Sequence, residues 1–298
     1  MTVRDVIQLT RPWQWSKNGI IFAGLIFSLN LRDPEYALRS LVAFLVFCLG
    51  SSTVYVLNDL SDIARDRLHP VKRERPLAAG RVSRGRAAAL AGVLLAVTLG
   101  GGWALGSQFF LSLVLFLLVN SAYSAYLRNL VILDVMLIAV SFVIRAIAGV
   151  LALRPLDAEI ELSPWLLVCT LFLALFLALG KRRHELGLLE GEAAGHRGSL
   201  GDYSPQFLDQ LMSIVTAATL IAYAIYTIAP GTLSKFHSPS LVFTIPFVTY
   251  GVFRYLFLVQ QRDEGGNPSR ALYRDLPLFV TILGWIALVL GIIYRNGF

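Results

Sequence analysis

Three aspartates follow a long apolar stretch of the sequence. Asp59, Asp62 and Asp66 are spaced i, i+3 and i+7, so on one continuous helix they would share a face, and Asn58 precedes Asp62 by four residues. Carboxylates grouped in this way repel one another unless a cation lies among them. Mg²⁺ prefers oxygen ligands and usually keeps waters and substrate phosphate oxygens as well. The spacing therefore predicts a magnesium site at Asn58, Asp59, Asp62 and Asp66.

A basic run follows the aspartates. His69 and Pro70 should break the helix and turn the chain back, so that Lys72, Arg73 and Arg75 approach the acidic face. Cationic side chains of this kind offer charge-assisted hydrogen bonds to a diphosphate, and arginine can make two at once. The alternative is a solvated helix end that only enforces topology. A topology signal needs lysine and arginine but has no use for three aspartates on one face.

The elements that must position these residues are membrane-spanning helices. Only 15% of the 298 residues are charged and the mean hydropathy is +0.66, whereas a soluble domain carries about 25% charged residues. A helix needs about 20 mostly apolar residues to cross a bilayer. The sequence predicts an all-α polytopic membrane protein that forms one domain over 1–298, with nine transmembrane helices. The nine expected spans are 16–31, 38–57, 87–105, 108–126, 131–151, 163–180, 211–229, 239–260 and 276–294.

The net charge of +7 is distributed unevenly among the loops. Most lysines and arginines fall in three segments, 57–86, 181–210 and 261–275. By the positive-inside rule these loops are cytoplasmic, which predicts a cytoplasmic N-terminus, an outside C-terminus and a multi-pass protein of the cell membrane with its active site facing the cytoplasm. This charge pattern requires no nucleic-acid partner. The glycine-rich stretch 186–201 is expected to be mobile.

Several motifs resemble one enzyme superfamily. Asn58-Asp59-x-x-Asp62-x-x-x-Asp66 resembles the first aspartate-rich motif of the UbiA-type prenyltransferase superfamily, whose members are nine-helix membrane enzymes that bind a magnesium diphosphate. A second set of motifs resembles the decaprenyl-phosphate phosphoribosyltransferase branch of that superfamily. This set comprises Arg11-Pro12-Trp13-Gln14-Trp15-Ser16-Lys17-Asn18, His69-Pro70-x-Lys72-Arg73-x-Arg75-Pro76-Leu77-Ala78-Ala79-Gly80, Leu133-Asp134-Val135, Phe142-Val143-Ile144-Arg145-Ala146-x-Ala148-Gly149 and Leu177-Ala178-Leu179-Gly180-Lys181-Arg182-Arg183.

The resemblance implies a reaction and its partners. The branch moves 5-phosphoribose from phosphoribosyl diphosphate to a polyprenyl phosphate of the decaprenyl type, with Mg²⁺ as cofactor, for cell-envelope polysaccharide synthesis. We accordingly expect Asp59, Asp62, Asp66 and Asp134 to be catalytic. The oligomeric state is left open, with a homo-oligomer among the options. An alternative is transfer of a prenyl group from prenyl diphosphate to an aromatic acceptor. A second alternative, an anionic-solute transporter, has little reason to carry an acidic face and a basic run on one side only.

The sequence departs from the superfamily after the sixth expected span. Where a second aspartate-rich motif is usual, this chain has Lys181-Arg182-Arg183-His184-Glu185. The departure argues against a second carboxylate-held metal and favours direct neutralisation of substrate phosphates. Lys181, Arg182, Arg183 and Glu185 are therefore substrate-binding candidates. The alternative is an ordinary basic stop for the span.

Four polar residues in or beside the expected spans complete the candidate site. Asp134 and Arg145 are eleven residues apart, so they lie on one helical face about 16 Å apart along its axis. An arginine at this depth is costly and usually faces a cavity or a partner. We expect Arg145 to bind a phosphate or to order the floor of a central cavity, the alternative being an internal ion pair. Lys17 and Tyr126 are further candidates for substrate contact, although interfacial tyrosines are commonly anchors.

Overall fold

The fold is helical throughout the residues that the structure describes. The computed structural model describes residues 1–161, 163–188, 198–262, 266, 271 and 274–295, and these contain helices and turns but no strand. Much of the glycine-rich stretch predicted to be mobile, residues 189–197, lies outside the described residues. The chain divides into two compact units, Met1–Ala125 with Ile144–Glu161, and Tyr126–Val143 with Leu162–Phe298. They are called unit 1 and unit 2 below.

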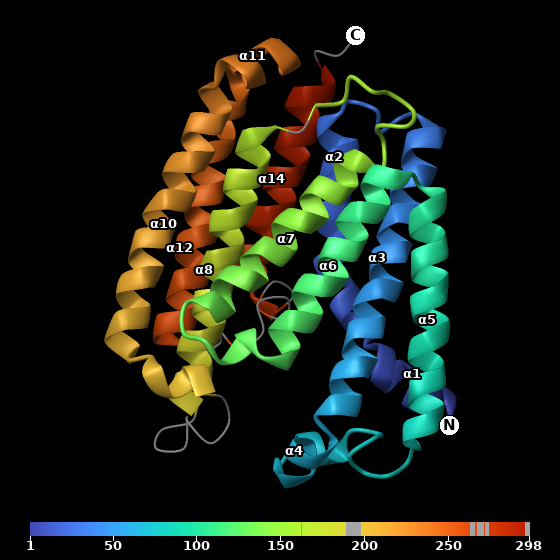
Figure 1. Ribbon diagram of the computed structural model, residues 1–298. Coiled ribbons are helices and arrows are strands. Elements are labelled where there is room, and N and C mark those ends of the chain that lie inside the picture. The colour runs from blue at the N-terminus through green and yellow to red at the C-terminus, as the bar shows by residue number, and fades with distance from the viewer. Residues whose placement is uncertain (162, 189–197, 263–265, 267–270, 272–273, 296–298) are drawn as a thin grey trace. The chain divides into compact units, whose positions relative to one another are not determined.

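Unit 1 is arranged around one long helix. Asp33 caps that helix by accepting a hydrogen bond from the backbone of Glu35, and Pro34 occupies its first turn, where no amide hydrogen is needed. The long helix, α3, contacts α1, η1, α5 and α6 (Figure 1). The helices of unit 1 are α1 (Val3–Thr10), η1 (Pro12–Ile21), α2 (Phe22–Phe27), α3 (Pro34–Ser61), α4 (Ile63–Leu68), η2 (Lys72–Glu74), α5 (Arg84–Ala104), α6 (Ser107–Ala125) and the second part of α7 (Leu133–Leu151).

The described residues of unit 2 form four long helices and several short ones. Helix α10 packs against α8 and α12, and α12 packs against α14 (Figure 1). Their shared core includes Phe176, Leu208, Met212 and Tyr255, all at most 3% exposed. The helices of unit 2 are η3 (Leu127–Asn129), the first part of α7, α8 (Pro164–Leu188), η4 (Gly198–Asp202), α10 (Pro205–Ile228), α11 (Pro230–Phe236), η5 (Pro239–Thr244), α12 (Ile245–Gln261) and α14 (Leu276–Arg295).

Eight of the nine expected spans are present as long apolar helices. Among the described residues, eight helices are long and apolar enough to cross a membrane, and each overlaps one predicted span. The exception is 16–31, where the chain forms the 3-10 helix η1 and then the six-residue helix α2. A physical reason is the polar content of η1, because Asn18 is fully buried and hydrogen-bonded to side chains of α3 and α7. The count of nine is therefore confirmed for eight spans.

A close backbone contact joins α2 to the second part of α7 within unit 1. A Cβ atom on Gly24 would lie 2.6 Å from the carbonyl carbon of Gly149, and a Cβ on Gly149 would lie 2.2 Å from the carbonyl oxygen of Ile21. Both distances are shorter than any side chain tolerates, so only glycine allows the two backbones to approach in this way. Gly149 belongs to one of the motifs identified from the sequence, and its role is packing.

Candidate active site

The helix that carries the aspartates ends among them. Helix α3 ends at Ser61, and Asp62 leaves helical geometry with φ −93° and ψ 6° before α4 begins at Ile63. The backbone carbonyl of Asn58 accepts hydrogen bonds from the backbone of Asp62 and from the hydroxyl of Ser61, both over 2.9 Å. The expectation that the three aspartates share one continuous helical face is therefore wrong. The chain bends at the middle aspartate, so that Asp59 and Asp66 lie on different helices.

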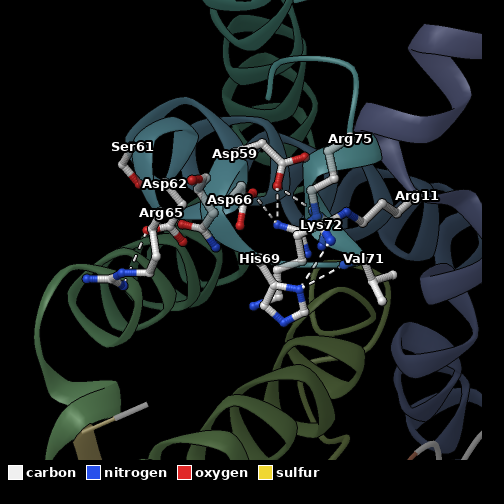
Figure 2. Close-up of polar contacts among 11 residues, drawn as sticks. Arg11, Asp59, Ser61, Asp62, Arg65, Asp66, His69, Val71, Lys72 and Arg75 are labelled. Atoms are coloured by element: carbon white, nitrogen blue, oxygen red, sulfur yellow. Dashed lines mark hydrogen bonds and ion pairs between the residues drawn. The ribbon is translucent and has the colours of Figure 1, made fainter. Parts of the chain in front are cut away.

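The bend brings Asp59 and Asp66 together and separates them from Asp62. Asp59 and Asp66, called the acidic pair below, are each 2% exposed. One nitrogen of Arg75, Nη1, donates to Oδ1 of Asp59 over 3.0 Å and to Oδ2 of Asp66 over 2.8 Å. Asp62 instead lies 3.6 Å from Arg65, whose side chain is exposed. Figure 2 shows Asp62 and Arg65 on one side and the acidic pair around Arg75 on the other.

A second arginine reaches the acidic pair from the start of the chain. Arg11 donates from Nη2 to Oδ1 of Asp59 over 2.5 Å, and its guanidinium lies 5.1 Å from the centre of the Tyr55 ring. Arg11 sits where α1 ends, in the left-handed conformation with φ 50°. Arg11 belongs to one of the motifs identified from the sequence, but its position in the sequence predicts no contact. Its partner is 48 residues away, and only the packing of α1 against α3 brings the two together.

The loop after α4 turns the basic run back as the sequence predicted. His69 is extended because it precedes Pro70, and its Nδ1 accepts hydrogen bonds from the backbone of Val71 over 3.1 Å and of Lys72 over 3.3 Å (Figure 2). The short helix η2 follows, and Arg75 comes directly after it. The histidine therefore acts as a turn-forming acceptor within a loop that delivers Arg75 to the acidic pair.

The other predicted phosphate ligands near the start of the chain and in this loop differ in exposure. Lys72 is half-buried, whereas Arg73 is exposed and lies 3.7 Å from the carboxylate of Glu74. Lys17 is half-buried on η1. The structure brings Arg75 to the acidic pair and leaves Arg73 on the surface.

The carboxylate oxygens of the acidic pair are candidate ligands for a metal ion. Among the described residues no group of three or more histidine, cysteine, aspartate or glutamate side chains is close enough to hold a metal ion. Oδ2 of Asp59 is buried and accepts no hydrogen bond within the part of the chain that the structure describes. Such an orphaned acceptor is costly unless a ligand satisfies it. Mg²⁺ is commonly held by one or two carboxylates together with substrate phosphates, so the acidic pair fits a magnesium ion that arrives with a diphosphate.

The second predicted cluster, which follows the sixth expected span in unit 2, forms ion pairs among its own residues and with Asp134. Arg182 is fully buried; it donates from Nε to Oδ2 of Asp134 over 2.7 Å and from Nη1 to Glu185 over 2.5 Å. The hydroxyl of Tyr203 donates to Oδ1 of Asp134 over 2.8 Å and accepts from the backbone of Ile132 over 2.7 Å. Burial, and then the negative charge of Asp134, raise the pKa of Tyr203. Both oxygens of Asp134 are thus engaged by protein groups.

Asp134 and Arg182, which the sequence proposes for catalysis and substrate binding, bind each other in this structure. The fully buried carboxylate and guanidinium hold α7 and α8 together. Their neighbours lie nearer the surface. Lys181 is 3.6 Å from Glu185 with its side chain 41% exposed, and Arg183 is 3.1 Å from Asp209 with its side chain 25% exposed. The basic run therefore points one cation inward and two outward.

Arg145 anchors the start of the chain in unit 1. It is 6% exposed, its Nε donates to Oδ1 of Asn18 over 2.7 Å, and its guanidinium lies 4.6 Å from the centre of the Phe116 ring. Asn18 also accepts from Ser51 over 3.4 Å and donates to the sulfur of Cys48 over 3.3 Å. Arg145 thus fastens η1 to α7, and its expected role at the floor of a cavity stays a prediction. Another candidate, Tyr126, is 65% exposed at the end of α6.

Comparison with known proteins decides the family. The sequence matches the UbiA prenyltransferase family over residues 19–282. The chain belongs to this family. It is thus an enzyme of the UbiA superfamily and, with its apolar helices, a multi-pass membrane protein. The fold is similar to that of a UbiA homologue from Archaeoglobus fulgidus bound to geranyl diphosphate (GPP) and Mg²⁺. The TM-score is 0.72 at 20% sequence identity, over 97% of this chain and 99% of that one.

Several curated relatives carry a narrower name. A decaprenyl-phosphate phosphoribosyltransferase from Mycobacterium tuberculosis (strain H37Rv) is 35% identical over 96% of this chain and 93% of its own. The protein of that name from Mycolicibacterium smegmatis is 32% identical over 98% of this chain and 93% of its own. The one from Corynebacterium glutamicum is 31% identical over 97% of this chain and 86% of its own. This UbiA-family chain is therefore similar over nearly its whole length to proteins of the branch that its motifs resemble.

Proposed function

We propose that this chain transfers 5-phosphoribose from phosphoribosyl diphosphate to a polyprenyl phosphate of the decaprenyl type. The observation that carries the proposal is the 31–35% identity, over nearly the full length, to relatives named decaprenyl-phosphate phosphoribosyltransferase. The family match covers 19–282, which includes most of both units, and supports treating 1–298 as one transferase domain. The product would be a polyprenylphosphoryl 5-phosphoribose for cell-envelope polysaccharide synthesis.

The acidic pair is the proposed metal site. Asp59 and Asp66 would hold Mg²⁺, with Asn58 and Asp62 as proposed further ligands. The ion would neutralise charge on the departing diphosphate. The burial of both carboxylates keeps bulk water from competing for their oxygens, and the unsatisfied Oδ2 of Asp59 offers one acceptor that no protein group uses within the described residues. Both features support metal binding here.

The cations around the acidic pair are the proposed donor-binding groups. Arg75 and Lys72 would donate to the diphosphate, where negative charge develops as the bond to the sugar breaks. Lys17, Arg73, Lys181, Arg183 and Glu185 remain proposed substrate contacts, with Tyr126 as a further one. The acceptor phosphate is already anionic, so no strong general base is required. Direct displacement at the anomeric carbon would invert its configuration.

We propose that the aspartate-bearing end of α3 faces the cytoplasm of a cell that carries the enzyme in its plasma membrane. The support is the clustering of lysine and arginine in 57–86, 181–210 and 261–275. A cysteine introduced at exposed Arg73 should react with a membrane-impermeant maleimide only in inverted vesicles. Reaction in right-side-out vesicles would reverse the proposed orientation.

A donor comparison tests the proposed reaction against its main alternative. Purified protein in lipid nanodiscs would receive Mg²⁺ and either labelled phosphoribosyl diphosphate with decaprenyl phosphate, or labelled geranyl diphosphate with an aromatic acceptor. We expect labelled lipid from the first pair only, and loss of at least about a hundredfold in rate for Asp59→Asn, because a charge-stabilising group is removed. Prenylation of the aromatic acceptor without a labelled lipid-linked sugar would support the prenyltransferase alternative instead.

A further inference from the structure

One guanidinium holds the acidic pair together. Nη1 of Arg75 lies within 3.0 Å of oxygens from both Asp59 and Asp66, whose side chains are 1% and 3% exposed. Two buried carboxylates at this separation repel each other strongly, and a single positive charge between them relieves the repulsion. Arg75 therefore occupies the place that a cation bound by both carboxylates would need. Figure 2 shows its side chain reaching between them.

The two arginines on Asp59 differ in how they are held. Arg11 follows α1, whose first turn is fixed by a reciprocal capping box between Thr2 and Asp5, and its guanidinium rests on the Tyr55 ring. Arg75 lies in extended backbone after the three-residue helix η2, with its side chain 29% exposed. Swinging Arg75 outward requires only side-chain rotation in a loop, whereas moving Arg11 would disturb the end of a packed helix. Arg75 is the cation that can leave.

We propose that Arg75 is an exchangeable internal counter-ion: it neutralises the acidic pair until Mg²⁺ arrives with the donor, and it then transfers its hydrogen bonds to the donor's diphosphate. This inference rests on the proposed function for the identity of the donor. Its consequence is cooperative binding. Mg²⁺ alone must displace a guanidinium without supplying another anion for it, whereas Mg²⁺ with a diphosphate supplies one. The metal and the donor therefore bind far better together than either does alone.

Metal binding without substrate gives the first test. Mn²⁺ can replace Mg²⁺ as a probe, because its free concentration is read directly by electron paramagnetic resonance in a titration of the purified protein. Arg75→Gln removes the competing charge, and we expect it to bind Mn²⁺ at least about tenfold more tightly than the wild type. The interaction energy of two charges near a protein surface exceeds the free energy of a tenfold change in affinity. Arg75→Lys keeps the charge and should remain within about threefold of the wild type.

Donor binding gives the second test, with the opposite sign. At saturating Mg²⁺, equilibrium dialysis with labelled phosphoribosyl diphosphate should show at least about tenfold weaker binding to Arg75→Gln, because a charge-assisted contact is lost. Arg86→Gln is the matched control; Arg86 is an exposed arginine of the first turn of α5, and its loss should change neither affinity. Elution of each variant as a single peak at the wild-type volume in size-exclusion chromatography verifies folding.

The outcomes separate this inference from the proposed function. Mn²⁺ affinity that is the same in Arg75→Gln and the wild type overturns the exchange, whatever the donor proves to be. Unchanged donor affinity in Arg75→Gln overturns it as well. If the wild type binds geranyl diphosphate and not phosphoribosyl diphosphate, the proposed function fails, and the Mn²⁺ titration still decides the exchange.

Discussion

Arg182 and Asp134 form a fully buried ion pair, in which Nε of the arginine lies 2.7 Å from Oδ2 of the aspartate and neither side chain is more than 1% exposed. The sequence places both residues in motifs of an enzyme branch, which made them candidates for contact with substrate. Because each charge is engaged by the other, we expect their first role to be holding α7 and α8 together. Breaking such a pair is expensive, since it leaves one buried charge without a partner.

Asp134→Asn should therefore lower the free energy of unfolding by about 3–5 kcal/mol. Asp209→Asn is the control, because it breaks the more exposed pair with Arg183 and should cost less than about 1 kcal/mol. Thermal unfolding followed by size-exclusion chromatography would measure both. If Asp134→Asn unfolds at the wild-type temperature but no longer transfers phosphoribose, the catalytic role expected from the sequence is the better interpretation.

Gly149 should tolerate no side chain. A methyl group there would lie 2.2 Å from the carbonyl oxygen of Ile21, so Gly149→Ala must push α2 away from α7. We expect a loss of about 1–3 kcal/mol, as for other overpacked sites, together with faster proteolysis of the first 30 residues. Gly92→Ala is the control, because no atom lies within 4 Å of its added methyl group, and it should stabilise α5 by up to about 1 kcal/mol. Equal stability of the two variants would contradict the close packing of α2.

The three aspartates should not be equivalent. Asp59 and Asp66 are buried around Arg75, whereas Asp62 pairs with the exposed Arg65. Replacing either member of the acidic pair by asparagine should raise the Mg²⁺ concentration for half-maximal activity at least about tenfold, because each supplies a ligand oxygen. Asp62→Asn should raise it by a smaller factor, because Asp62, a proposed further ligand, is not grouped with the acidic pair in the described residues. A larger effect of Asp62→Asn than of Asp66→Asn would mean that the bend after α3 straightens when the metal binds.

The start of α14 should lose stability in acid. Arg254 donates to both oxygens of Asp275, over 3.1 and 2.8 Å, and the backbone of Leu278 donates over 2.9 Å. The hydrogen bonds from Arg254, more than that from Leu278, hold the pKa of Asp275 below its ordinary value. A pKa that is lower in the folded state gives stability that is present above the unfolded pKa of about 4 and is lost as pH falls through the folded value.

Thermal unfolding between pH 7 and pH 3 would measure this contribution. The unfolding temperature of the wild type should fall further over that range than the unfolding temperature of Asp275→Asn, which has no carboxylate to protonate. Parallel curves for the two proteins would show that Asp275 contributes nothing to the acid sensitivity.

Much of the fold follows from the sequence because each membrane span is one continuous apolar run of residues. Eight predicted spans match helices, and their ends agree to within a few residues in most cases. The segment 16–31 is not confirmed as one long helix, and there Asn18 is buried through contacts with α3 and α7, which lie 30 or more residues away. The expectation of one continuous helix through Asp62 is wrong because the break depends on contacts outside the repeat. A helical repeat predicts one continuous helix, but Asp59 and Asp66 lie on separate helices and are joined by Arg75.

The candidate site was predictable in its residue types more than in its pairings. Sequence spacing identified the aspartates, the turn at His69 and the return of Arg75. It could not identify Arg11, because that contact depends on how α1 packs against α3. Nor could it distinguish Arg182, which is buried against Asp134, from Lys181 and Arg183, which are partly exposed. Three consecutive cations look alike in a sequence and differ only once a distant carboxylate and Tyr203 surround one of them.

The most direct test of the central claim follows two labels through one reaction. Phosphoribosyl diphosphate would carry ¹⁴C in the ribose and ³²P in the terminal phosphate of its diphosphate, and would be given to the purified protein with Mg²⁺ and decaprenyl phosphate. Phosphoribosyl transfer predicts ¹⁴C in the lipid product and ³²P released as free diphosphate in equal amount. Incorporation of ³²P into the lipid, or a lipid fraction without ¹⁴C, would contradict it.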